Sequence, residues 1–150
     1  MKKTLYVSRP LINTEPFIDW AKSQGFTQTL KAENLHVTVA FSREEVEWEE
    51  ISPKTGSIAV AGGTRTVSSL GDDGAVVLKF KSDFLPKRWQ EFKDAGASWD
   101  YESYQPHVSI TYDGSGVDLE SIEPYTGELV LGAEVFSELD LDWMSKEKEE

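Results

Sequence analysis

The chain has 150 residues with 39% hydrophobic content, which suits a single domain with its own core, and it has no cysteine, which excludes disulfides and thiolate chemistry. It has no apolar run long enough to span a bilayer, and its basic start lacks the apolar core of a signal peptide, so we expect no membrane partner. The formal net charge is −12, most of it in residues 113–150; we therefore expect no long nucleic acid as a partner, because such ligands normally need a broad basic surface.

The first half of the chain predicts the order strand, helix, strand, strand. Residues 4–10 have the pattern of an apolar strand. Apolar residues then recur at helical spacing between Thr14, a candidate N-cap, and Gly25, a candidate C-terminal cap. Further strands are expected at 36–41, where side chains alternate in character, and at 57–62, a stretch with turn residues at its ends.

The second half predicts the same order again. A strand at 75–81 is followed by helical spacing of apolar residues between Ser82 and Gly96. Strands are then expected at 107–112 and at 128–132.

The chain also aligns with itself, without a gap, at an offset of 71 residues. Ten of the 35 positions in 22–56 are identical to their counterparts in 93–127, whereas composition alone would give about two. The identical pairs include both histidines of the chain, His36 and His107. We interpret this pattern as an internal duplication.

Each half is too small to bury an adequate core alone, so we expect one domain over residues 1–150. The repeats are roughly 1–71 and 72–143, with a tight turn at 71–74 and an acidic tail at 144–150. The fold class that follows is α+β, with two pseudo-symmetric lobes whose antiparallel sheets flank a central groove.

Each histidine opens the same small pattern, His-Val-hydroxyl-aliphatic. Because alternate residues of a strand share a face, His36 and Thr38 should point one way, and so should His107 and Ser109 in the second copy. The opposite side, which should face the core, is expected to carry Val37, Val39, Phe41, Val108, Ile110 and Tyr112. Two-fold symmetry between the halves would gather two imidazoles and two hydroxyls around one point.

That arrangement suits displacement at phosphorus, in which the attacking hydroxyl loses a proton and the leaving oxygen gains one. Imidazole has an unperturbed pKa of about 6.5, so one copy can accept a proton while the other donates one. The two hydroxyls can donate hydrogen bonds to the non-bridging phosphate oxygens. A lone strand histidine is usually structural, but two matched copies favour catalysis. Because neither motif has cysteine or a tight carboxylate cluster nearby, we expect no metal or other cofactor.

Five stretches extend the pattern over nearly the whole chain: TLYVSRP at 4–10, WAKSQGF at 20–26, LHVTVAFS at 35–42, GASWDYESYQPHVSITY at 96–112 and LDW at 141–143. With them, the sequence resembles the 2H phosphoesterase superfamily, and within it the phage anti-CBASS protein 1 family of cyclic-oligonucleotide phosphodiesterases. The resemblance implies a 2H phosphoesterase-like fold.

The resemblance also implies a catalytic set of His36, Thr38, His107 and Ser109, of which Ser109 departs from the more usual threonine. One histidine would activate a ribose 2′-hydroxyl beside a 3′–5′ phosphodiester, and the other would protonate the departing 5′ oxygen. Which histidine starts as the base stays open, as do the ring size and base preference of the substrate and the oligomeric state.

Members of the family grip a nucleobase, and the resemblance points to Tyr6, Glu138 and Trp143 as substrate-binding residues. Tyr6 and Trp143 are equally compatible with a place in the core. Four basic residues could contact phosphate, although surface solubility is the simpler interpretation: Lys79, Lys81, Lys87 and Arg88.

The implied function is metal-independent cleavage of 3′–5′ bonds in cyclic di- or trinucleotide second messengers. It would take place in the cytoplasm of an infected bacterium, would let a phage evade CBASS immunity, and would need no obligate protein partner. Two alternatives stay open. The first is a 2H phosphoesterase acting on RNA ends, either ligase-like or a 2′,3′-cyclic phosphodiesterase, which the acidic charge argues against. The second is a non-catalytic cyclic-nucleotide sponge, which the intact double motif argues against.

Overall fold

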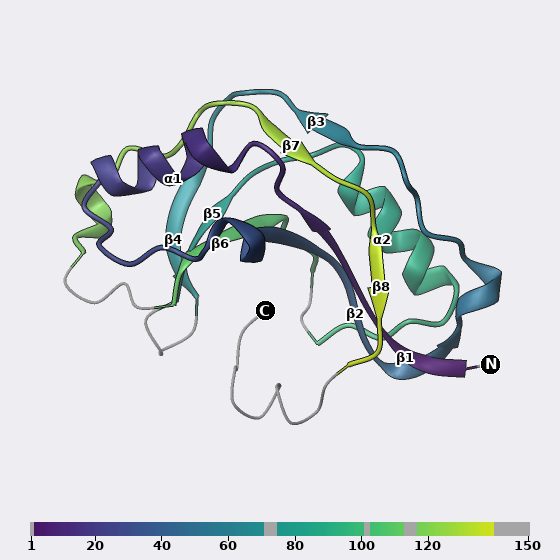
Figure 1. Cartoon of the computed structure of the whole chain (residues 1–150). Helices are drawn as coiled ribbons and strands as arrows, with labels where there is room; N and C mark the ends of the chain where they lie inside the picture. The colour runs from purple at the N-terminus through teal and green to yellow at the C-terminus, as the bar shows by residue number, and fades with distance from the viewer. Residues whose placement is uncertain (1, 71–74, 101–102, 113–116, 140–150) are drawn as a thin grey trace.

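The computed structural model describes residues 2–70, 75–100, 103–112 and 117–139 (Figure 1). The strands in these ranges are β1 (Lys2–Pro10), β2 (His36–Glu47), β3 (Ile58–Val60), β4 (Thr66–Leu70), β5 (Ala75–Lys79), β6 (His107–Thr111), β7 (Leu129–Leu131) and β8 (Val135–Ser137). The helices are α1 (Thr14–Ser23) and α2 (Leu85–Asp94), with short 3-10 helices η1 (Ala32–Asn34), η2 (Trp48–Glu50) and η3 (Leu119–Ser121). The turn expected at 71–74 and the tail expected at 144–150 lie outside the described residues.

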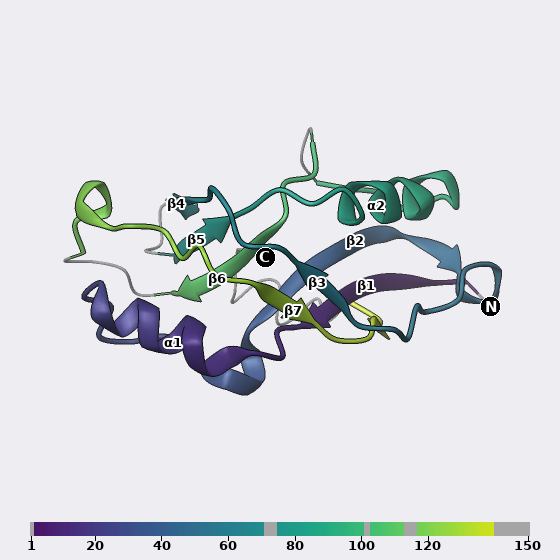
Figure 2. The ribbon, with the colours of Figure 1, turned by 90° about the horizontal axis from the view of Figure 1, so that it is seen from above.

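Six of these strands form one sheet in the order β4-β5-β6-β2-β1-β8, and β3 pairs with β7 in a separate ladder. All the pairings in both sheets are antiparallel. Both helices and the small β3–β7 ladder lie on one side of the larger sheet, which arches beneath them (Figures 1 and 2). The α+β class expected from the sequence is confirmed.

The elements of the two halves correspond to each other along the chain. Helix α2 follows α1 by 71 residues at both ends, and β7 follows β3 by the same interval. At the centre of the large sheet Val37 pairs with Val108, and in the small ladder Ala59 pairs with Val130. Each of these residues therefore pairs with its own counterpart at the 71-residue offset. The two motif strands, β2 and β6, are neighbours in a single sheet instead of facing each other from two sheets.

The helix ends follow the sequence at three of the four predicted positions. Gly25 and Gly96 have φ angles of 99° and 106°, a region that glycine adopts without strain. The hydroxyl of Ser82 accepts hydrogen bonds from two backbone N–H groups at the start of α2. Thr14, in contrast, is the first helical residue, so Asn13 holds the N-cap position. The Asn13 amide does not cap the helix, because it hydrogen-bonds the backbone of residues 128 and 130 instead.

The hydrophobic core lies between the large sheet and the layer of helices. Strand residues at alternate positions face it, including Leu5, Val7 and Val37, and the helices contribute Phe17 and Phe92. These five side chains are at most 1% exposed. Their burial fixes which face of β1 and β2 is directed away from the helices, and the site described below lies on that other face.

One buried ion cluster interrupts this apolar core. The carboxylate of Glu134 accepts hydrogen bonds from Nε and Nη2 of Arg88, both at 2.8 Å, and lies 3.8 Å from Nη2 of Arg9. All three side chains are at most 4% exposed. Arg88 is therefore held inside the protein, so both interpretations given for it from the sequence, a solubilising surface position and a contact with phosphate, are wrong.

Candidate active site

The two histidine motifs meet through the pairing of β2 with β6. Val37 lies opposite Val108 in an antiparallel ladder, and the same register sets His36 opposite Ser109 and Thr38 opposite His107. All four motif side chains thus share one face of the sheet. Directly opposite residues have Cβ atoms about 5 Å apart, and diagonal neighbours about 7–8 Å. Each histidine therefore stands beside the hydroxyl residue of the other motif, with the two imidazoles on a diagonal.

Both imidazoles are oriented by the same backbone contact. Nδ1 of His36 donates to the carbonyl oxygen of Asn34 at 2.8 Å, and Nδ1 of His107 donates to that of Gln105 at 2.9 Å. A carbonyl oxygen can only accept, so Nδ1 carries the proton in each neutral ring. Each histidine consequently presents Nε2, either as an acceptor when neutral or as a donor when protonated. The arrangement fits a pair of general acid and base groups.

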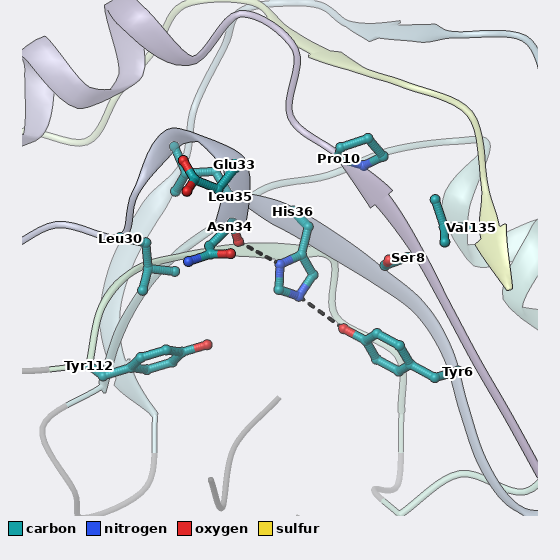
Figure 3. A pocket seen from close by; sticks show the side chains of 10 residues that line it. All are labelled: Tyr6, Ser8, Pro10, Leu30, Glu33, Asn34, Leu35, His36, Tyr112 and Val135. Carbon is teal, nitrogen blue, oxygen red and sulfur yellow. Dashed lines mark hydrogen bonds between the residues drawn. The ribbon is translucent and has the colours of Figure 1, made fainter. Parts of the chain in front are cut away.

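The hydroxyl of Tyr6 lies between the two side chains of the first motif. It is 2.9 Å from Nε2 of His36 and 3.0 Å from Oγ1 of Thr38 (Figure 3). When His36 is neutral, Nε2 accepts from the tyrosine hydroxyl, and the Thr38 hydroxyl donates to the tyrosine oxygen. Tyr6 comes from β1, whose side chains at positions 6, 8 and 10 share the face of the motifs. The sequence predicts Tyr6 as a base-binding residue, whereas its contact with His36 arises from the pairing of β1 with β2.

Two β-bulges correct the expected orientation of two aromatic residues. The β1–β2 pairing skips one residue at Val39, and the β5–β6 pairing skips one at Ile110. An extra residue in one strand turns the following side chains to the opposite face. Phe41 therefore packs edge-to-face on Tyr6 with ring centroids 6.0 Å apart, and Tyr112 lines a cavity beside His36. The prediction that both face the core is wrong.

That cavity has a volume of about 600 Å³ and opens next to His36. The close-up in Figure 3 shows Tyr6 and Tyr112 on its two sides with His36 between them. Leu30 and Pro10 add apolar lining, and Glu33 contributes a carboxylate. Aromatic walls beside a polar reactive group suit a ligand that carries a flat ring next to a phosphate.

Tyr104 links the loop before the second motif to the strand of the first. Its hydroxyl donates to the backbone carbonyl oxygen of Thr38 at 2.6 Å. Its ring stacks on Trp89 with centroids 5.8 Å apart and meets Trp99 edge-on. Burial raises the pKa of Tyr104 well above that of a free phenol, so the hydroxyl stays protonated and keeps donating. These contacts hold the loop before the second motif against β2, and sequence patterns did not reveal them.

Of the remaining predicted binding residues, only Glu138 lies in the part of the chain that the structure describes. Glu138 is exposed and follows β8, the strand whose Ser137 pairs with Tyr6. It does not line the cavity beside His36. Trp143 and the LDW stretch at 141–143 lie outside the described residues. Glu138 and Trp143 remain predictions.

In the part of the chain that the structure describes, no group of three or more histidine, aspartate or glutamate side chains is placed to hold a metal ion. The same part contains no helix of the length and apolarity needed to cross a membrane.

The comparisons with known proteins decide the family. The family model for Anti-CBASS protein Acb1 matches residues 3–146. The chain belongs to the Acb1 family. Anti-CBASS protein Acb1 from Caulobacter sp. (strain RHG1) is 53% identical over 94% of this chain, and that from Sphingomonas paeninsulae is 49% identical over 94%. The chain spans only 23% and 24% of the length of these two relatives. The Acb1 of Escherichia phage RB16 is 26% identical, over 95% of this chain and 90% of its own length.

Solved structures agree on the fold of this Acb1 family member. A crystal structure of a phosphoesterase superposes with a TM-score of 0.62 at 16% identity, covering 91% of this chain and 87% of the other. E. coli LigT in its apo form gives a TM-score of 0.59 at 17% identity, with coverages of 93% and 96%. The predicted likeness to 2H phosphoesterases is thus confirmed at the level of the fold.

Proposed function

We propose that this chain is a phosphodiesterase that cleaves the 3′–5′ linkages of cyclic di- or trinucleotides without a metal ion. The observation that carries the proposal is the β2–β6 pairing, which sets two Nδ1-anchored imidazoles and two hydroxyls on one face of one sheet. Membership in the Acb1 family supports the substrate class. The proposed consequence is loss of a bacterial immune signal, which lets a phage evade CBASS immunity.

In the proposed reaction one histidine takes the proton from a ribose 2′-hydroxyl, and the 2′ oxygen forms a new bond to phosphorus. The bond from phosphorus to the 5′ oxygen breaks, and the second histidine gives its proton to that oxygen. The product is a ring-opened nucleotide ending in a 2′,3′-cyclic phosphate or its hydrolysed form. Thr38 and Ser109 donate hydrogen bonds to the non-bridging oxygens, where negative charge is held in the transition state.

Tyr6 has two roles in this proposal, one for its hydroxyl and one for its ring. Its hydroxyl occupies Nε2 of His36, so it shifts aside when a substrate oxygen takes that place. Its ring, on the wall of the cavity beside His36, stacks on a nucleobase. Glu138 and Trp143 are proposed, from the family resemblance, to complete the grip on that base.

We also propose the finer description of the fold that the sequence suggested. The two halves derive from an internal duplication, and the face of the large sheet that carries both motifs, with the cavity beside His36, forms one central groove. The 71-residue offset between α1 and α2, and between β3 and β7, supports this history.

The proposed site of action is the cytoplasm of an infected bacterium, on a small cyclic substrate, with no membrane, no long nucleic acid and no obligate protein partner. The net charge of −12 supports a compact substrate, because a long polyanion would be repelled on approach.

The test is to incubate the protein with 3′–5′ linked cyclic di- and trinucleotides and to follow linear products by mass spectrometry. We expect rapid opening of the rings and much slower cleavage of single-stranded RNA of similar base content. A ring with 2′-deoxyribose at the scissile linkage should bind without being cut. Comparable rates on RNA or RNA ends would favour the alternative 2H activity, binding without any cleavage would indicate a sponge, and rapid cutting of the deoxy ring would refute the 2′-hydroxyl as nucleophile.

A further inference from the structure

A second cavity, of about 530 Å³, lies on the flank of the site that carries His107. Its lining includes Lys79, Lys81, Thr64 and Thr66, together with Gln105, whose carbonyl oxygen orients His107. Gln105 connects this cavity to the second motif, although neither His107 nor Ser109 is among the residues that line it.

The strand register shows that the two cavities occupy equivalent places. Pro10 of β1 lies opposite His36, and Lys79 of β5 lies opposite His107. Both residues stand on the outer side of their histidine, because β1 and β5 flank the central pair β2 and β6. The same position therefore holds a neutral ring on one flank and a cation on the other.

The cationic flank is arranged as a row across three strands. Thr66 of β4 lies opposite Lys79, which lies opposite His107, so a hydroxyl, an ammonium and an imidazole share one face. Lys79 is half-buried, and among the ion pairs found between described residues none involves Lys79 or Lys81. Arg65 adds positive charge to the wall, but its guanidinium is already bonded to the carbonyl oxygens of Tyr125, Gly127 and Ala61.

Two lysines and hydroxyl donors at a cavity mouth are the groups that bind a phosphate. In a chain with a net charge of −12, two such cations beside an active-site candidate are a local exception. The scissile phosphate must lie between the two imidazoles, whereas Lys79 stands outside His107 on the side away from His36.

We propose that Lys79, assisted by Lys81, binds a phosphate of the substrate other than the one that is cleaved. The proposal rests on the proposed function for the identity of the substrate. In this proposal the cavity beside His36, with its aromatic walls, takes a base, and the cationic cavity takes the neighbouring phosphate. Since a cyclic dinucleotide has a second phosphate and a dinucleoside monophosphate has none, the site would select the cyclic messenger.

The experiment compares Lys79→Met with Lys79→Arg and with Lys87→Met, a control on the exposed surface of α2 that lines none of the described cavities. For a 3′–5′ cyclic dinucleotide, Lys79→Met should lower kcat/KM at least 10-fold, mainly through KM, while the two other variants stay within about 3-fold. For a linear 3′–5′ dinucleoside monophosphate, with its single phosphate, Lys79→Met should change kcat/KM less than 3-fold. An equal loss on both substrates, or no loss on either, overturns the proposal.

A binding measurement separates this proposal from the proposed function. In a His36→Ala background, calorimetry with the cyclic dinucleotide should show at least a 10-fold weaker affinity when Lys79 is changed to Met. If the unaltered protein binds the ring in a Lys79-dependent way without cutting it, the phosphate site stands and the proposed reaction fails. If the ring is cut but Lys79→Met binds it normally, the reaction stands and the phosphate site fails; if the ring is neither bound nor cut, both fail.

Discussion

The hydroxyl of Tyr6 lies 2.9 Å from Nε2 of His36, across the boundary between β1 and β2. Thirty residues of chain separate the two. The contact places the tyrosine ring at the edge of the proposed reaction centre, where the ring can stack on a nucleobase. The tyrosine hydroxyl meanwhile covers Nε2 of His36, the nitrogen that the proposed reaction needs.

Substitutions at Tyr6 should therefore separate the ring from the hydroxyl. Tyr6→Ala removes the stacking surface and should raise KM for a cyclic dinucleotide about 5- to 150-fold, the equivalent of roughly 1–3 kcal/mol. Tyr6→Phe keeps the ring and should raise KM less than 3-fold. Steady-state kinetics gives KM for both variants. If Tyr6→Phe raises KM as much as Tyr6→Ala does, the hydroxyl and not the ring binds substrate.

Removal of either motif hydroxyl should slow the reaction without abolishing it. Thr38→Ala and Ser109→Ala each delete one hydrogen-bond donor to the phosphate, and kcat should fall about 100- to 1,000-fold. Ser109→Thr and Thr38→Ser keep the donor and should remain within about 10-fold of the unaltered protein. If the alanine variants lose activity as completely as variants of the histidines, the hydroxyls must do more than stabilise charge on the phosphate oxygens.

Cleavage should persist in excess chelator, because the proposed reaction draws its proton transfers from imidazoles. The pH–rate curve should be bell-shaped, since one imidazole must be unprotonated and the other protonated in the same molecule. Tyr104 should add no limb to the curve, because burial raises its pKa and keeps its hydroxyl protonated. Activity lost in chelator and restored by a divalent cation would contradict the mechanism.

The buried ion cluster predicts a large loss of stability. Glu134→Ala leaves the guanidinium groups of Arg9 and Arg88 buried without their carboxylate, and the free energy of unfolding should fall by about 3–5 kcal/mol. Glu91→Ala is a matched control, because Glu91 also pairs with Arg88 but is 54% exposed, and it should cost less than about 1 kcal/mol. Urea unfolding measures the free energy of unfolding of both variants. Similar losses in the two would show that the buried cluster contributes no more to stability than the exposed ion pair.

Several features of the fold were predictable because they depend on local pattern. The strands at 4–10 and 75–81 and the helix ends at Gly25 and Gly96 follow from short-range periodicity and backbone preference. The edge strands β4 and β8 were not predicted, because β4 (TVSSL) is largely polar, β8 (VFS) has only three residues, and the pairing of both depends on their neighbours.

The features that shape the site were harder to predict, because they arise between strands. The bulges at Val39 and Ile110 are properties of register, and they alone decide that Phe41 and Tyr112 face the site. The contact of Tyr104 with the carbonyl of Thr38 joins segments 66 residues apart. The alternation rule did place His36 with Thr38, and His107 with Ser109, each pair on one face of its own strand. The meeting of the two pairs depends on the pairing of Val37 with Val108.

The central claim, that the two imidazoles act as acid and base, is tested most directly by single-turnover cleavage of a cyclic dinucleotide by His36→Ala and His107→Ala. Both variants should remain folded by circular dichroism, since neither side chain belongs to the buried core. We expect each to lose cleavage altogether, because the reaction needs both proton transfers. Near-normal turnover by either folded variant would contradict the account.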